Sequence, residues 1–271
     1  MGRPVLQGKE QIMQIIQCEV LGAAVTGYLH THHDRLIAHV KRPALIICPG
    51  GGYFFTSPRE ADPPALAFAA QGYNVFILDY ACNEQAKDGL PLRQLAETVR
   101  LVRERAEEWN LEPDKIAVMG FSAGGHLAAS LGAFWNAPDI RLPAGCRPDA
   151  LLLCYPVITL LEHTHAGTSD NVSGGREEER LRLSVELGVT KDFPPAFIWH
   201  TVDDDSVPVE NSLLLVQALQ REKVPFECHL FAHGHHGISV CTQEVETPNP
   251  ECAPWVGLCQ TWLNKQFNYV P

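Results

Sequence analysis

A serine flanked by small residues stands in the segment Gly120-Phe121-Ser122-Ala123-Gly124, between an apolar run and a helix-forming one. The pattern Gly-x-Ser-x-Gly is typical of a sharp strand-to-helix turn, because only small neighbours fit beside a turn that exposes the serine hydroxyl. The following helix begins beneath the serine, and its N-terminal N–H groups favour a developing oxyanion. The segment therefore predicts Ser122 as a nucleophile for acyl transfer.

Three consecutive glycines, Gly50-Gly51-Gly52, follow another apolar run at 44–48. Without Cβ atoms, their backbone N–H groups are free to face a substrate oxygen. An ordinary turn needs only one or two glycines, so we favour a role in binding the oxyanion. The next three residues, Tyr53, Phe54 and Phe55, either line the acyl or alcohol pocket or pack beneath the loop, and the sequence leaves both readings open.

Acidic and basic side chains follow two later apolar runs, in the order serine, acid, histidine that such sites use. Asp203-Asp204-Asp205 follows the run at 196–199, and three histidines within 233–236 follow the run at 225–231. Open α/β sheets place their active sites at the carboxyl ends of strands. We therefore expect one aspartate and one histidine from these segments to meet the serine.

The elements that must position these motifs are short apolar runs alternating with helical patterns, which predicts βα units and a mainly parallel sheet. Unbroken apolar runs are typical of strands that are buried on both faces. The weak alternation of segment 19–40 favours antiparallel edge strands. The other predicted strands are 44–48, 74–80, 116–119, 150–154, 196–199 and 225–231.

Helices are expected between these strands, and the clearest has apolar side chains at steps of three and four. Ser206 is the expected N-cap of one helix, with Pro208 in its first turn. Segment 163–190 is polar and rich in turn residues, and it is either a small lid over the strand ends or a solvated loop. The expected helices are 60–71, 92–109, 207–221 and 252–265, within a single domain over 1–271.

Composition fits this reading, because 271 residues suffice for one sizeable α/β domain. The net charge of −11 disfavours a nucleic acid or an anionic membrane as partner, and a neutral small molecule fits best. No apolar run reaches the length of a signal peptide or a membrane span, so we expect a cytoplasmic protein. The nine cysteines form no Cys-x-x-Cys pair, which favours reduced, buried thiols.

Taken together, the motifs resemble the bacterial acetyl-esterase and acetyl-xylan-esterase-like branch of the α/β hydrolases, kin of hormone-sensitive-lipase-type esterases. The resemblance implies an α/β-hydrolase fold, with a mostly parallel central sheet and helices on both faces. It also implies a serine esterase acting on acetyl-type esters, including those of sugars or xylo-oligosaccharides. It covers roughly residues 43 to 240 and rests on 48–53, 120–126, 154–158, 204–212 and 236–237.

The resemblance also selects among the candidate side chains. The family's aspartate lies four residues before a proline, here Pro208, which selects Asp204 as the acid. The family's Gly-x-His-Gly pattern selects His236 as the base over the two earlier histidines, with Ser122 as nucleophile. It implies the backbone N–H groups of Gly51, Gly52 and Ala123 as oxyanion donors, and we expect substrate contacts from Tyr53, Phe121 and Tyr155.

The chain departs from the family pattern in three places. Pro49 replaces the histidine of a His-Gly-Gly-Gly loop, which changes the support of the loop but leaves its N–H donors. Thr201 replaces the glycine usual after His200. The long N-terminal cap helices of the lipase-like relatives are missing, which favours an open pocket and small acyl groups. Feruloyl esters, peptides and a non-catalytic binding role remain as alternatives.

Two histidine-rich segments, 30–34 and 233–236, offer metal-ligand residue types. Neither has a second cluster at a spacing known for metal sites, and histidines in loops are usually solvated. We therefore expect no metal ion and no cofactor. The expected partner is a small-molecule ester, with no nucleic acid and no membrane, and a homodimer is left open.

Overall fold

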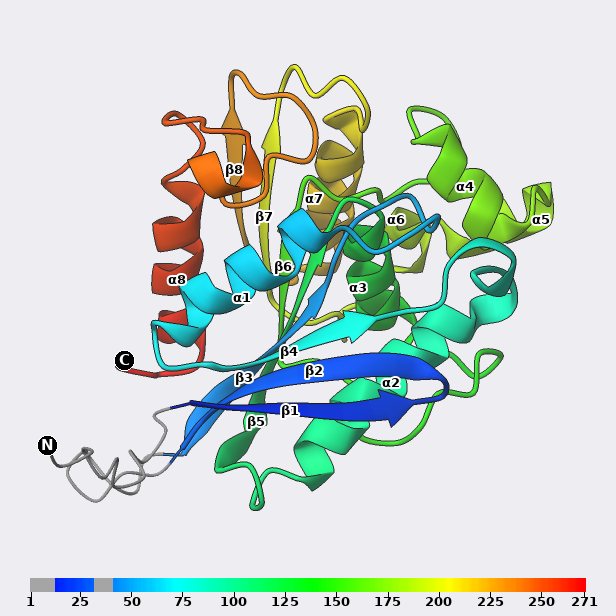
Figure 1. Cartoon of the computed structure of the whole chain (residues 1–271). Coiled ribbons are helices and arrows are strands. Elements are labelled where there is room, and N and C mark those ends of the chain that lie inside the picture. The colour runs from blue at the N-terminus through cyan, green and yellow to red at the C-terminus, as the bar shows by residue number, and fades with distance from the viewer. Residues whose placement is uncertain (1–12, 32–40) are drawn as a thin grey trace, which may run out of the picture.

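A computed structural model describes residues 13–31 and 41–271. Within these ranges the strands form one eight-stranded sheet in the order β1-β2-β4-β3-β5-β6-β7-β8 (Figure 1). β1 and β2 are antiparallel to each other and β2 is antiparallel to β4, whereas the other neighbours are parallel. The strands are β1 Met13–Val20, β2 Ala23–His30, β3 Arg42–Cys48, β4 Asn74–Asp79, β5 Leu111–Phe121, β6 Ala150–Cys154, β7 Ala196–Thr201 and β8 Phe226–Phe231.

All six predicted core strands are present, and the expected antiparallel edge is formed by β1 and β2. The edge was expected within 19–40, but β1 lies almost entirely before that segment, and residues 32–40 lie outside the described residues. The mostly parallel sheet of the expected α/β-hydrolase fold is confirmed.

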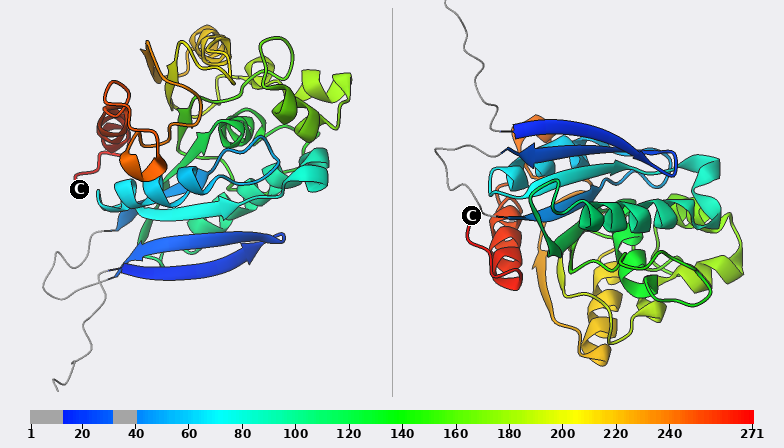
Figure 2. Two further views of the ribbon diagram at one scale, coloured as in Figure 1. Left: turned by 45° about the horizontal axis from the view of Figure 1, so that its top comes forward. Right: turned by 90° about the horizontal axis from the view of Figure 1, so that it is seen from below.

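The sheet is buried on both faces because successive strand residues enter opposite cores. On β3, Ile46 belongs to one apolar core while Leu45 and Ile47 belong to the other. The helices α1 Asp62–Ala69 and α8 Trp255–Gln266 pack on the second core. The first core is covered by α2 Leu90–Glu104, α3 Ala123–Phe134 and α7 Glu210–Glu222 (Figures 1 and 2).

The strand order creates a switch point at β3, which lies between β4 and β5. The chain crosses to one side of β3 to form β4, and then returns to form β5 on the other side. Loops leaving two such neighbouring strands diverge and leave a crevice at their carboxyl ends, where open α/β sheets bind ligands. The glycine loop follows β3 and Ser122 follows β5, so the switch point brings these two motifs together.

The predicted helix over 207–221 begins three residues late, at Glu210. Ser206 does not cap it, because its backbone N–H binds Asp204 and its hydroxyl donates to Asp205. The N-cap position is Val209, which gives no side-chain cap. The loop therefore folds around the Asp204 carboxylate before the helix begins. The last helix likewise begins at Trp255 rather than at 252, because Pro254 precedes its first turn.

Segment 163–190 forms three short helices, α4 Ala166–Ser173, α5 Glu177–Leu183 and α6 Val185–Gly188. α4 and α5 lie at one side of the molecule (Figure 1), whereas α6 packs against the end of α3, where a Cβ on Gly188 would meet the Phe134 ring. α4 is tied to the body of the domain, since Ser169 donates to the Leu160 carbonyl and Asn171 to the Gly52 carbonyl. Across the described chain, no helix combines the length and apolar character needed to cross a membrane.

Candidate active site

Ser122 lies between the end of β5 and the start of α3, with φ 53° and ψ −119°. A non-glycine residue adopts this region only under strain, and such strain gathers at functional sites. The neighbouring glycines are required sterically: a Cβ on Gly120 would overlap the Gly124 carbonyl, and one on Gly124 would overlap the Cys48 carbonyl. The N–H of Ser122 donates to the Cys154 carbonyl over 3.0 Å, which fixes the turn to β6.

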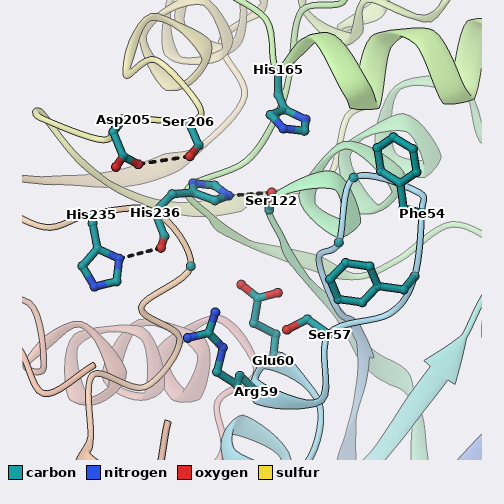
Figure 3. A pocket seen from close by; sticks show the side chains of 14 residues that line it. Phe54, Ser57, Arg59, Glu60, Ser122, His165, Asp205, Ser206, His235 and His236 are labelled. Atoms are coloured by element: carbon teal, nitrogen blue, oxygen red, sulfur yellow. Dashed lines mark hydrogen bonds between the residues drawn. The ribbon is translucent and has the colours of Figure 1, made fainter. Parts of the chain in front are cut away.

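His236 joins the predicted nucleophile to the predicted acid. Its Nε2 lies 2.7 Å from the Ser122 Oγ (Figure 3), and its Nδ1 lies 2.7 Å from an Asp204 oxygen. Because an ionised carboxylate only accepts hydrogen bonds, Nδ1 carries the imidazole proton and Nε2 accepts the serine proton. The Asp204 side chain is 1% exposed and that of His236 is 18% exposed, so substrate reaches the histidine while the carboxylate is shielded from water.

Asp204 is held by more than one donor. Its Oδ1 accepts the N–H groups of Ser206 and Val207 over 2.9 and 2.8 Å, and His200 Nε2 lies 3.3 Å from its Oδ2. Burial alone would raise the pKa of Asp204, but hydrogen bonds from His200, His236 and Val207 hold that pKa well below its usual value. The carboxylate is therefore ionised when it faces the imidazole.

The neighbouring aspartates are occupied elsewhere. Asp203 accepts hydrogen bonds from His233 and from the Gly234 N–H, at 3.0 and 2.7 Å, and so tethers the loop that carries His236. Asp205 accepts the Ser206 hydroxyl over 3.0 Å. Asp204 is thus the carboxylate of this run that lies in contact with His236. In the described ranges, no group of three or more histidine, cysteine or acidic residues has an arrangement that could hold a metal ion.

The glycine loop beside Ser122 is held by its other polar groups. The Gly50 N–H donates to Glu60 over 2.8 Å, and Tyr80 donates to the Pro49 carbonyl over 2.6 Å. Gly51 and Gly52 have φ values of 125° and 65°. Among the described residues, their N–H groups and that of Ala123 have no hydrogen-bond acceptor. Glu60 and Tyr80 thus hold the loop in place at the peptide group between Pro49 and Gly50.

Glu60 was missed by sequence reasoning, although it lines the cavity and is only 4% exposed. Its Oε1 accepts the Tyr155 hydroxyl over 2.7 Å, and that hydroxyl in turn accepts the Ser239 N–H over 2.9 Å. Burial raises the pKa of Glu60, against hydrogen bonds from Tyr155 and Gly50 and the charge of His236. The segment Ser57-Pro-Arg-Glu reads as a polar turn, so nothing in its pattern indicated a buried carboxyl group.

The three aromatic residues expected to contact substrate do not line the cavity. Tyr53 is buried and its hydroxyl lies 3.1 Å from His126 Nδ1, because its positive φ turns the side chain beneath the loop. Phe121 is buried against Tyr155 and Trp255, since a strand residue next to the outward Ser122 points into the core. Tyr155 supports His236 from behind, with ring centroids 5.0 Å apart.

The cavity around Ser122 has a volume of about 550 Å³, within the range of small-molecule sites (Figure 3). Phe54 and Phe55, whose side chains are about half exposed, form one wall. These two aromatic residues therefore line the pocket rather than pack beneath the loop. Segment 163–190 contributes His165 to the cavity, and its role as a lid stays a prediction. The other lining side chains are Ser57, Arg59, Glu60, Asp205, Ser206, His235 and His236.

A serine that lines a cavity at a strand-to-helix turn, followed along the chain by an acid and a histidine at later strand ends, defines a serine hydrolase of the α/β-hydrolase class. Comparison with known proteins agrees. Residues 36–144 match the BD-FAE family, and residues 156–253 match the prolyl oligopeptidase family.

The relatives narrow the class to a family. The chain is 36% identical over 227 residues to endo-1,4-beta-xylanase B of Butyrivibrio fibrisolvens, and 30% identical over 208 residues to the acetylxylan esterase of Xylanibacter ruminicola. These alignments cover 80% and 73% of this chain but only 35% and 42% of those proteins. The structure of an acetyl ester-xyloside bifunctional hydrolase from Caldicellulosiruptor lactoaceticus matches with TM-score 0.80 and 35% identity, covering 92% of this chain and 89% of that one. The chain belongs to the acetyl-esterase and acetyl-xylan-esterase-like branch of the α/β hydrolases, a branch of serine ester hydrolases.

Proposed function

We propose that this chain is a serine carboxylesterase that hydrolyses short-chain, acetyl-type esters, including those of sugars or xylo-oligosaccharides, through Ser122, His236 and Asp204. The observation that carries the proposal is the pair of hydrogen bonds, each 2.7 Å long, that joins these three side chains in series. The relatives named as an acetylxylan esterase and an acetyl ester-xyloside hydrolase support the acetyl group and the sugar alcohol.

In the proposed acylation step, the Ser122 Oγ attacks the ester carbonyl carbon while His236 Nε2 takes the serine proton. Asp204 stabilises the resulting imidazolium through its hydrogen bond to Nδ1. The negative charge on the former carbonyl oxygen is stabilised by the free N–H groups of Gly51, Gly52 and Ala123. The bond to the alcohol oxygen then breaks, and His236 gives its proton to the leaving alcohol.

Deacylation reverses these roles with water. His236 accepts a proton from a water molecule that attacks the acyl carbon, and the same three N–H groups stabilise the second oxyanion. The Ser122 Oγ leaves with the proton that His236 returns. The carboxylic acid is released, and the hydrogen bond between His236 and Ser122 forms again.

The polarity of the cavity supports a short acyl group. Figure 3 shows Arg59 and Glu60 on one side of Ser122, and His165 and Asp205 on the other. A long alkyl chain on either side would displace water from a charged or polar group without replacing its hydrogen bonds, which costs free energy. An acetyl group covers little of this surface.

The test is a series of p-nitrophenyl esters from acetate to octanoate, together with acetylated xylo-oligosaccharides. We expect the acetate to give the highest kcat/KM, and we expect Ser122→Ala to abolish turnover while leaving the circular dichroism spectrum unchanged. Ser57→Ala is the matched control, because Ser57 lines the same cavity without contact to His236. A preference for octanoate would contradict the short acyl group, and full activity of Ser122→Ala would contradict the mechanism.

Two other substrate classes have a specific observation behind them. The exposed rings of Phe54 and Phe55 offer a surface for an aromatic acyl group such as ferulate. The match of residues 156–253 to the prolyl oligopeptidase family covers both Asp204 and His236, which keeps peptides as a candidate. Methyl ferulate and a proline p-nitroanilide belong in the same assay, and turnover of either above that of the acetate would replace the acetyl assignment.

A further inference from the structure

His165 lies at the start of α4, and its ring serves as the N-cap of that helix. Its Nδ1 accepts the backbone N–H of Thr168 over 3.1 Å and lies 2.9 Å from the Thr168 hydroxyl. A backbone N–H can only donate, so Nδ1 bears the lone pair. In the neutral ring the proton is therefore on Nε2. Burial lowers the pKa of His165 against the opposing charge of Asp204, which keeps the ring neutral.

The rest of the ring faces the catalytic cavity. Figure 3 shows His165 above Ser122, across the cavity from Glu60. The ring stands against the glycine loop, since a Cβ added to Gly52 would lie 3.4 Å from His165 Cε1. The Phe54 ring borders the same place, because that Cβ would lie 3.1 Å from Phe54 Cδ2. Within 13–31 and 41–271, no protein acceptor bonds to His165 Nε2.

We propose that His165 is a specificity-determining residue that donates its Nε2–H to an oxygen of the alcohol part of the substrate. The proposal rests on the proposed esterase function. The cavity of about 550 Å³ far exceeds an acetyl group, so most of it must hold the alcohol. A fixed donor beside the Phe54 ring suits a hydroxylated ring, which presents oxygens at its edge and C–H groups on its face. A site built to bond a hydroxyl discriminates against analogues that lack it.

One substitution separates this role from helix capping. In His165→Asn, the shorter side chain keeps an oxygen that can accept the Thr168 N–H, because asparagine is a favoured N-cap. The donor that reaches into the cavity is lost. His163→Asn is the matched control: His163 is exposed, does not line the cavity, and has φ 59°, a conformation that asparagine tolerates.

The experiment measures kcat/KM for an acetylated xylo-oligosaccharide and for phenyl acetate, whose alcohol part carries no further oxygen. For His165→Asn we expect a loss of about tenfold on the sugar ester, the size of one neutral hydrogen bond, with phenyl acetate within about twofold of wild type. His163→Asn should match wild type on both. Thermal unfolding checks that the cap is kept.

Equal losses on the two esters, or no loss on the sugar ester, would overturn the assignment of His165. A wild-type protein that hydrolyses phenyl acetate but no sugar acetate would overturn this inference and the sugar alcohol of the proposed function, and would leave the esterase mechanism standing. A wild-type protein that hydrolyses neither ester would overturn the proposed function, and the role of His165 with it.

Discussion

The hydroxyl of Tyr155 donates to the buried carboxylate of Glu60 over 2.7 Å, and this bond lies at the centre of a network beneath the catalytic cavity. Glu60 also accepts the Gly50 N–H of the glycine loop, and Tyr155 accepts the Ser239 N–H of the loop that follows His236. The two loops that carry the predicted oxyanion donors and the predicted base are thereby connected through two side chains.

Tyr155→Phe should both destabilise the protein and slow it. The substitution leaves a Glu60 oxygen and the Ser239 N–H buried without a partner, which costs about 1–3 kcal/mol of unfolding free energy for each group. Urea unfolding measures that loss, and kcat should fall because the loop after His236 loses the hydrogen bond from the Ser239 N–H to the Tyr155 hydroxyl. Tyr73→Phe is the control, since it removes a hydrogen bond to Asn264 far from the site. It should cost stability without changing kcat, and an equal change in kcat would show that the network does not position the site.

Replacement of the three consecutive aspartates should separate their roles. Asp204→Asn should lower kcat by about 10⁴-fold, because the amide favours the wrong imidazole tautomer and no longer stabilises the imidazolium. Asp203→Asn keeps an oxygen for the Gly234 N–H, and Asp205→Asn keeps one for the Ser206 hydroxyl, so both should stay within about tenfold of wild type. Steady-state kinetics on p-nitrophenyl acetate decides this. Similar losses in all three variants would mean that Asp204 has no special role.

The core strands were predictable because each is an unbroken apolar run, which the burial of both sheet faces requires. The positions of helix starts were not. The expected cap of α7 failed because the Ser206 hydroxyl bonds Asp205 while its N–H bonds Asp204, contacts that depend on the fold of the whole loop. Helix boundaries depend on such local competition for hydrogen bonds, which periodicity does not record.

The residues of the candidate site likewise fall into those that the sequence predicts and those that it does not. The positions of Ser122, Asp204 and His236 follow from motifs that each need particular residue types at strand ends. Glu60 and His165 escaped notice because a carboxyl group in a polar turn and a histidine in a polar segment carry no pattern of their own. The burial of Tyr53, Phe121 and Tyr155 away from the cavity has a related cause: motif membership placed them near Ser122 but did not give the direction of their side chains.

Gly124→Ala should disable the strand-to-helix turn. The added Cβ would overlap the Cys48 carbonyl, a backbone group of β3 that cannot move away without disturbing the sheet. We expect the unfolding free energy to fall by several kcal/mol, at the upper end for single substitutions, or the protein to fail to fold.

Gly257→Ala is the matched control, because a Cβ there meets nothing within 4 Å in the helix α8. It should raise the unfolding free energy by up to about 1 kcal/mol, as alanine favours helices. A Gly124→Ala protein as stable as wild type would contradict the packing of the turn.

The buried His126 should make stability depend on pH below neutrality. Burial lowers the pKa of His126 from 6.5 to about 4, and its ring bonds Tyr53 and the Leu183 carbonyl while neutral. Between pH 6.5 and 4 the unfolded chain binds a proton at this histidine that the folded protein does not, so the unfolding free energy falls as pH falls. The shift corresponds to a contribution on the order of 3 kcal/mol over that window.

In His126→Gln, which keeps a donor for the Leu183 carbonyl, the curve of unfolding free energy against pH should be flatter between pH 6.5 and 4. Urea unfolding of both proteins across this range measures the two slopes. Equal slopes would show that His126 takes up its proton as readily in the folded protein as in the unfolded chain.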